Sequence, residues 1–231
     1  DEGSSDSTDV ERQHFLNATK VVDASARKII VCSVIRPDQD DRQALTQPLL
    51  DLSVCTDIVV VDWDLHGDNG ELALNAISGM ANPDGAMGRL RLIAIYTGSS
   101  DIASISTKVS EKLSQAPGAK VQQLDDGFTI VLGPNRILVF AKPETKLPET
   151  YRSRVVAFED LAERLTAEFA RMTASLVSNA VLASLAGIRR NAHKLLANFG
   201  SDLDAPYLTH RALLDTNPEN AEEQLVALIS E

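Results

Sequence analysis

The 231-residue chain is poor in cysteine, in aromatic side chains and in positive charge. Its two cysteines are too few for a disulfide framework or a cysteine-based metal cluster. No apolar run approaches the roughly 18 residues of a membrane-spanning helix, and no signal-peptide core opens the chain. Acidic residues outnumber basic ones by 33 to 22, and the basic residues form no stripe that would attract nucleic acid or an anionic membrane. We therefore expect a cytoplasmic protein with neither nucleic acid nor membrane as a partner.

The order of the predicted elements indicates an α/β fold. Three segments are apolar throughout rather than alternately apolar and polar, and we predict them as strands: Lys28–Ile35, Asp57–Val61 and Leu90–Tyr96. Around and between them, a helical pattern is found in residues 11–23, 41–52, 71–80 and 102–115. Strands that are apolar on both faces are typical of a parallel sheet covered by helices on both sides.

Two more apolar runs follow, and they surround the turn-forming residues Gly133, Pro134 and Asn135. This arrangement predicts a β-hairpin. We expect its first arm, with the sequence GFTIVLG, to be an added antiparallel strand at the edge of the sheet.

The composition becomes helical after Pro148, and residues 155–199 carry apolar side chains at helical spacings of three and four. We therefore predict an α/β domain over residues 1–150 and an α-helical extension over residues 151–231. The long helix of the extension folds back on the sheet, offers a surface for dimerisation or output, or does both. Small residues near its middle would permit the close approach of a second helix.

The chemistry-bearing residues stand where strands end. Asp62, Thr97 and Lys142 follow three predicted strands, and the carboxyl ends of parallel strands form the edge where ligands and catalysis gather. A carboxylate can attack phosphorus, while a lysine and a hydroxyl can bind phosphoryl oxygens. A carboxylate nucleophile facing a phosphoryl group needs Mg²⁺ to offset charge repulsion. Each residue alone is ordinary after a strand, so the prediction depends on all three occurring together.

The strings VVVDWDLHGDNG, LIAIYTG and ILVFAKP, in this order, resemble the receiver domain of two-component response regulators. The resemblance implies a flavodoxin-like fold and a phosphoryl group accepted on Asp62 from a histidine kinase. It implies that Thr97 and Lys142 contact the phosphoryl oxygens and that Gly70 is the loop glycine after the acceptor. It also implies that the backbone carbonyl of Asp64 is a Mg²⁺ ligand.

The resemblance extends beyond the first domain. The strings EFARMTASLVSNAVLASLAGIRRNAHKLL and YLTHRALL are similar to the divergent response-receiver family of bacterial conflict and anti-phage two-component systems. The whole chain thus resembles a phosphorelay receiver with a helical extension, and the extension is a candidate surface for a homodimer.

The resemblance further implies an acidic pair at the end of the first strand, for which the chain offers Asp38, Asp40 and Asp41. However, only 21 positions separate the last of these from Asp62. Two helices, a strand and their loops need roughly 35–40 residues. We therefore interpret Lys28–Ile35 as the second strand and expect the first strand upstream of Asp1, with Asp1 and Glu2 at its acidic end. The predicted Mg²⁺ ligands are accordingly Asp1, Asp62 and Asp64.

Two alternatives stay open, so the sequence does not decide whether the chain is an enzyme. Asp62-Trp63-Asp64 also fits the DxD opening of haloacid-dehalogenase-type phosphatases, although His66 stands where those enzymes usually carry Thr or Val. Their second acidic pair follows a strand, whereas Asp125-Asp126 precedes one. The other alternative is a receiver-shaped interaction module that never uses Asp62.

Overall fold

The computed structural model describes residues 17–35, 46–64, 67–81, 90–174 and 176–198. The chain divides into two compact units, residues 1–173 and residues 174–231. The first unit contains the sheet with its helices, and the second contains helix α7 (Leu176–Asn198). No helix in the described part of the chain is long and apolar enough to cross a membrane.

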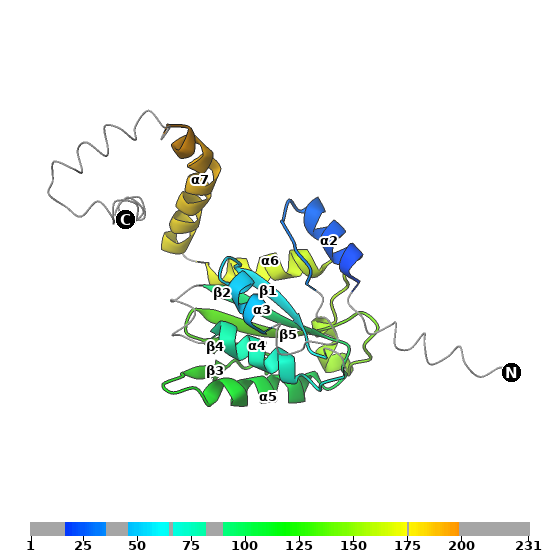
Figure 1. The fold of residues 1–231 in the computed structure, drawn as a ribbon. Coiled ribbons are helices and arrows are strands. Elements are labelled where there is room, and N and C mark those ends of the chain that lie inside the picture. The colour runs from blue at the N-terminus through cyan, green and yellow to red at the C-terminus, as the bar shows by residue number, and fades with distance from the viewer. Residues whose placement is uncertain (1–16, 36–45, 65–66, 82–89, 175, 199–231) are drawn as a thin grey trace. The chain divides into compact units, whose positions relative to one another are not determined.

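The first unit is a mixed α/β structure (Figure 1). Its strands are β1 (Ile58–Asp62), β2 (Arg91–Thr97), β3 (Val121–Gln123), β4 (Thr129–Leu132) and β5 (Asn135–Ala141). Its helices are α2 (Ala18–Arg27), α3 (Thr46–Ser53), α4 (Glu71–Ala81), α5 (Ile102–Ser114), the 3₁₀ helix η1 (Glu149–Arg154) and α6 (Leu161–Met172). The sheet order is β1-β2-β5-β4-β3, in which β1, β2 and β5 are parallel to one another. The predicted flavodoxin-like α/β fold with parallel strands is confirmed.

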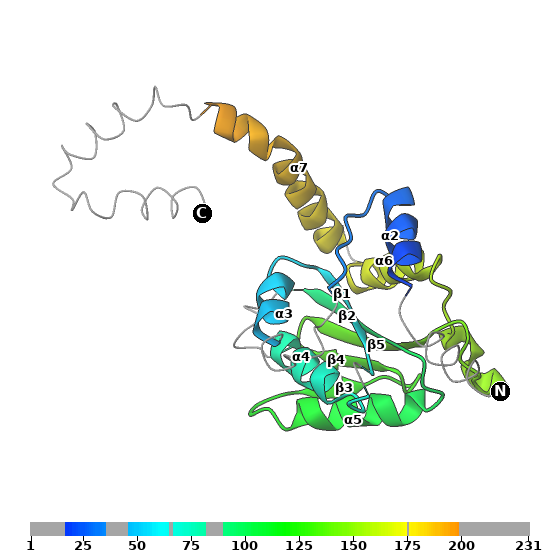
Figure 2. The same ribbon diagram turned by 45° about the vertical axis from the view of Figure 1, so that its right-hand side comes forward.

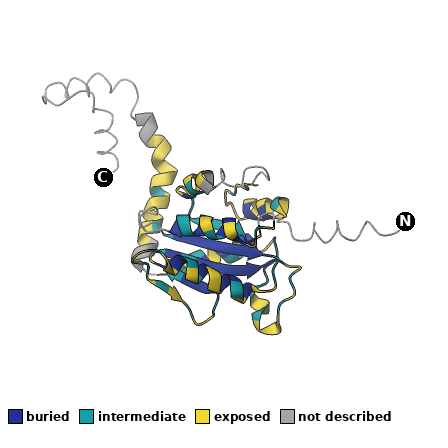
Figure 3. Cartoon of the chain, turned by 60° about the horizontal axis from the view of Figure 1, so that its bottom comes forward, coloured by how far each residue is buried: buried dark blue, intermediate teal, exposed yellow. Residues whose placement is uncertain are grey.

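Helices cover both faces of the sheet (Figure 2). The inner strand β2 is buried along its whole length, and Figure 3 shows the interior of the sheet as buried. Two of its side chains point to the face that α4 and α5 cover, Ile93 and Ile95. Three others belong to the cluster formed with α2 and α6, namely Leu92, Ala94 and Tyr96. This two-sided burial is the physical reason why the run is apolar throughout.

The predicted hairpin is confirmed, because β4 and β5 pair antiparallel around the turn at Gly133. The prediction that its first arm lies at the edge of the sheet is wrong. The arm, β4, occupies an inner position, and the edge is the short strand β3, which pairs antiparallel with β4. The sequence of β3, Val-Gln-Gln, has too little apolar character to be predicted as a strand.

The helical region after residue 155 is two helices rather than one. Helix α6 ends at Met172, and the hydroxyl of Thr173 donates to the carbonyl oxygen of Ala170 at 3.1 Å. Such side-chain bonds to the helix backbone compete with helix continuation. Helix α6 contacts β2 and α2, so it belongs to the sheet unit, whose boundary is Thr173.

The predicted strand Lys28–Ile35 is not a strand in the structure. Helix α2 ends at Arg27, a turn follows, and residues 30–35 have no regular secondary structure. Ile29 and Val31 are 96% and 100% exposed. The apolar composition is not enough, because a strand also needs a neighbour for its backbone hydrogen bonds. The sheet ends at β1, which pairs with β2 and with no other strand of the described chain.

The other predicted strands and helices agree with the structure, some of them closely and some only in part. The predicted strand at residues 57–61 and the helices at residues 71–80 and 102–115 match β1, α4 and α5 closely. The predicted helices over residues 11–23 and 41–52 correspond to α2 and α3 only in their later parts. The earlier parts, together with Asp1, Glu2, Asp38, Asp40 and Asp41, lie outside the described residues.

Candidate functional site

The three residues singled out in the sequence come together at one edge of the sheet. Asp62 is the last residue of β1, Thr97 is the last of β2, and Lys142 directly follows β5. The parallel register places Asp62 opposite Tyr96 and Thr97 opposite Ala141, so the three strand ends are level. The backbone N–H of Lys142 also donates to the carbonyl oxygen of Thr97 at 2.8 Å.

Asp62 and Lys142 form a buried ion pair. The Lys142 ammonium donates to Oδ2 of Asp62 at 2.6 Å, and the side chains are 2% and 19% exposed, respectively. Burial raises the pKa of Asp62 above its ordinary value, even though Lys142 and the backbone N–H of Asp64 favour the charged carboxylate. The carboxylate therefore combines a charge partner with a largely water-free setting, in which electrostatic interactions are strong.

Thr97 is 1% exposed, and its hydroxyl oxygen accepts the backbone N–H of Ser99 at 3.0 Å. That bond fixes the oxygen and leaves the O–H proton to donate to another group. Helix α5 begins shortly afterwards, where the side chain of Asp101 caps it by accepting the N–H of Ser104. The loop after β2 is thus held at both ends, next to the Asp62–Lys142 pair.

The loop after β1 is anchored by two residues that the sequence analysis did not single out, Trp63 and Asp68. Trp63 is 5% exposed and packs into the core, and Gly70 lies against its indole ring with a φ of +88°. Asp68 accepts the backbone N–H groups of Gly70 and Leu72 at the start of α4. The glycine expected in this loop is therefore required at Gly70, because a side chain there would meet the indole ring. The single tryptophan of the chain, directly after Asp62, is the sequence signal that could have indicated this contact.

The predicted metal ligands are only partly described. Asp62 and Asp64 stand together at the end of β1, whereas Asp1 lies outside the described residues. Within the described residues, no group of three His, Cys, Asp or Glu side chains could hold a metal ion. Mg²⁺ binds oxygen ligands, through one or two carboxylates with waters and phosphate oxygens completing the shell. The donor chemistry of Asp62 and Asp64 fits that ion.

Asp126, one member of the acidic pair considered for a phosphatase, makes its hydrogen bonds within a turn and to an arginine. Asp126 accepts the backbone N–H groups of Phe128 and Thr129 and an N–H of Arg154. Although burial alone would raise it, these hydrogen bonds, with that of the Thr129 hydroxyl, lower the pKa of Asp126 to about 2. Asp126 therefore orders the turn before β4. Among the described residues it belongs to no group of three or more His, Cys, Asp or Glu side chains that could hold a metal ion.

The comparisons with known proteins agree with this geometry. The family model described as "Response receiver domain" matches residues 1–147, which is more than half of the chain. No curated protein and no solved structure matches the chain. Carboxylate, hydroxyl and ammonium groups at three adjacent strand ends, together with this match, show that the chain belongs to the response receiver domain family.

Proposed function

We propose that this chain is the phosphoacceptor of a two-component phosphorelay and that Asp62 receives the phosphoryl group. The observation that carries the proposal is the buried contact of 2.6 Å between Lys142 Nζ and Asp62 Oδ2, with Thr97 at the adjoining strand end. A cation placed against a carboxylate nucleophile is also placed against the phosphoryl group that the nucleophile would receive.

The proposed donor is the phosphohistidine of a histidine kinase. A carboxylate oxygen of Asp62 forms a bond to phosphorus while the phosphorus–nitrogen bond of the phosphohistidine breaks. The electron pair of that bond stays on the imidazole nitrogen, which is then protonated, and the product is an acyl phosphate. A small donor such as acetyl phosphate reacts in the same way and releases acetate.

Lys142 and Thr97 have separate tasks in this proposal. Before transfer, Lys142 holds the Asp62 carboxylate; after transfer, its ammonium group binds a phosphoryl oxygen. The Thr97 O–H donates to another phosphoryl oxygen. Because the phosphoryl group adds a charge of about −1.5 to −2, both residues shift toward it, and this shift is the proposed signal.

Receiver domains typically bind Mg²⁺, and this chain would hold the ion through Asp62 and Asp64, with Asp1 as the predicted third ligand. The ion supplies positive charge that offsets the repulsion between the carboxylate and the phosphoryl oxygens. Asp64 would contribute its backbone carbonyl oxygen, two residues after Asp62 in the chain.

The test is intact-mass spectrometry after incubation with acetyl phosphate and Mg²⁺. The wild-type chain is expected to gain about 80 Da, the mass of one phosphoryl group, as an adduct that hydroxylamine removes. Asp62→Asn is the matched variant that should gain nothing. A folded wild-type chain that gains no mass would favour the phosphorylation-independent interaction module. Continuous phosphate release over many turnovers would favour the phosphatase.

We also propose that the helical extension mediates a homodimer. Helix α7 exposes Val181, Leu185 and Ile188, whose spacings of four and three place them on one side of the helix. A second copy of the same stripe would cover them. Leu185→Glu should then lower the molar mass measured by light scattering, whereas Ala183→Glu, on the opposite side of the helix, should not.

The resemblance to the response-receiver family of bacterial conflict systems is the basis of a proposal about the role of the chain in the cell. We propose a cytoplasmic role in antiviral defence, in which a partner histidine kinase phosphorylates Asp62. Cells that carry the wild-type system should survive phage infection better than cells that carry Asp62→Asn. Equal survival at equal protein levels would contradict the defence role while leaving phosphotransfer intact.

A further inference from the structure

A buried tyrosine connects the candidate site to the segment that precedes α6. Tyr96 directly precedes Thr97 and is fully buried, and its hydroxyl donates to the carbonyl oxygen of Val156 at 2.7 Å. The edge of its ring meets the ring of Phe158, with centroids 5.7 Å apart and planes at 89°. A buried phenol oxygen needs a hydrogen-bond partner, and here the backbone of Val156 provides one.

The other backbone group of Val156 is held from the neighbouring strand. Its N–H donates to the carbonyl oxygen of Ala141 at 3.0 Å, and Val155 forms an isolated parallel bridge with Ala141. Ala141 directly precedes Lys142. The N–H and the C=O of Val156 are therefore bound by the residues that stand immediately before Lys142 and Thr97.

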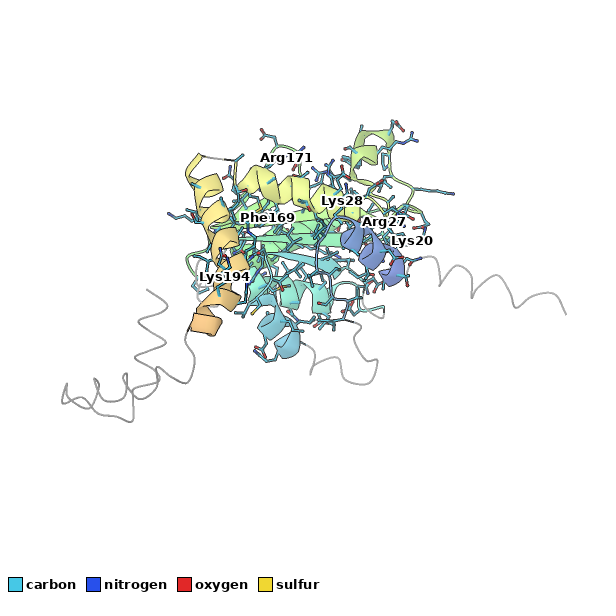
Figure 4. All side chains as sticks on the ribbon, turned by 90° about the horizontal axis from the view of Figure 1, so that it is seen from above. Lys20, Arg27, Lys28, Phe169, Arg171 and Lys194 are labelled. Carbon is cyan, nitrogen blue, oxygen red and sulfur yellow. The ribbon has the colours of Figure 1, made fainter. Side chains whose placement is uncertain are left out.

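The chain leads from this point into α6. Phe158 precedes α6 and Leu161 is its first residue. The two are 5% and 1% exposed and belong to the same cluster as Tyr96. Helix α6 in turn contacts α2, and Figure 4 shows the labelled Lys20 and Arg27 on α2 and the labelled Phe169 and Arg171 on α6. The ion pairs Lys20–Glu159 and Lys28–Glu163 join α2 to this region at the surface. Exposed pairs of this kind resist rearrangement weakly.

We propose that Tyr96 and Val156 are positioning residues that couple α6 to the phosphoacceptor site, so that phosphorylation of Asp62 changes the packing of α6 through these two hydrogen bonds. The inference rests on the function proposed above, because it needs Thr97 and Lys142 to shift when the phosphoryl group arrives. Movement at the end of β2 reaches Val156 through the Tyr96 hydroxyl. Movement at the end of β5 reaches it through Ala141.

The environment of Tyr96 suits this role. Burial raises the pKa of its hydroxyl above the ordinary value, with further contributions from the negative charges of Glu144, Glu159 and Asp62. The group therefore stays protonated, and the hydroxyl remains a donor to Val156 throughout the physiological range of pH.

The experiment compares hydrogen exchange of residues 155–172 before and after phosphorylation with acetyl phosphate and Mg²⁺. Tyr96→Phe removes the hydroxyl and keeps the ring. It should accept as much phosphate as the wild type by intact mass, but the phosphorylation-dependent change in exchange should fall at least twofold. Tyr151→Phe is the matched control, because the Tyr151 ring also makes an edge contact, with Phe128 at 4.9 Å, but in a different core cluster from that of Tyr96 and Val156. It should behave as the wild type.

The outcomes separate the two proposals. If the wild-type chain gains no phosphoryl group, the proposed function fails. If the wild type is phosphorylated but residues 155–172 do not respond, the coupling is wrong. It is also wrong if Tyr96→Phe responds as fully as the wild type, or if Tyr151→Phe loses the response equally. Phe158→Leu, which keeps the hydroxyl bond but removes the ring contact, should retain the response if the hydrogen bond carries it.

Discussion

The indole ring of Trp63 occupies the space that a side chain at Gly70 would need. A Cβ atom on Gly70 would stand 2.7 Å from Cδ2 of Trp63 and closer still to two other ring carbons. Because Trp63 directly follows Asp62 and is buried, this contact determines the path of the loop that follows the candidate phosphoacceptor. The glycine therefore supports the site from eight positions away.

Gly70→Ala should destabilise the fold for two reasons. The φ of +88° is unfavourable for alanine, and the new methyl group overlaps the buried ring. Strain and overpacking together predict a loss of about 2–4 kcal/mol in the free energy of unfolding, measured by urea denaturation. Gly118→Ala is the control, because Gly118 has a φ of +74° with open space around it. It should lose only about 1 kcal/mol, from the backbone alone. Equal losses would show that the Trp63 contact does not matter.

The stability contribution of Asp62 should change with pH in a defined direction. Because burial raises its pKa, the folded chain binds the proton on Asp62 more tightly than the unfolded chain does. The resulting stabilisation is present below the ordinary carboxyl pKa of about 3.9 and is lost as pH rises through the raised value. The unfolding free energy of Asp62→Asn, minus that of the wild type, should therefore increase between pH 4 and pH 7.

Asp126 supplies a control of opposite sign for this measurement. Its pKa is lowered to about 2, so its stabilisation is present above the ordinary pKa and is lost as pH falls. Asp126→Asn should therefore become less stable relative to the wild type as pH rises from about 2 to about 4. Urea denaturation across these pH values tests both variants. A flat difference for Asp62→Asn would contradict the raised pKa.

Lys142→Met should impair both stability and phosphorylation. Removing one partner of a buried ion pair leaves the other charge uncompensated, which costs about 3–5 kcal/mol, and Asp62 is the charge left behind. The rate of adduct formation with acetyl phosphate should fall at least tenfold, because a cation at the phosphoryl oxygens is lost. The double variant with Asp62→Asn should recover much of the stability but no phosphorylation. If that double variant is as unstable as Lys142→Met, the ion pair is not the reason for the loss.

The parallel strands near the site were predictable because their environment matches their composition. All seven residues of β2 are buried, so an apolar run on both faces was a sufficient signal. Lys28–Ile35 has an equally apolar composition, yet this segment pairs with no strand of the described chain. Strand propensity describes how a side chain fits a sheet, and it cannot report whether a neighbouring strand is present.

The candidate site was predictable in its central residues and not in its supports. Asp62, Thr97 and Lys142 each follow a strand directly, so parallel topology alone brings them to one edge. The hydrogen bond from the Tyr96 hydroxyl to Val156 joins residues that are 60 positions apart in the sequence. It depends on how α6 packs against the buried cluster that contains Tyr96. Such tertiary contacts leave no periodic signal in a single sequence.

Arg91 provides a test that separates stability from function. It is 2% exposed at the start of β2, and its guanidinium donates to the carbonyl oxygens of Met80 at 2.8 Å and Ser53 at 2.7 Å. These carbonyls lie at the carboxyl ends of α4 and α3, where a positive charge is favourable. Arg91→Met should cost about 3 kcal/mol or more, because buried carbonyl groups lose a charged donor. Since Arg91 stands at the opposite end of β2 from Thr97, the folded fraction should still gain the phosphoryl adduct at the wild-type rate. A slower rate per folded molecule, by intact mass after correction for unfolding, would show that the two ends of β2 are coupled.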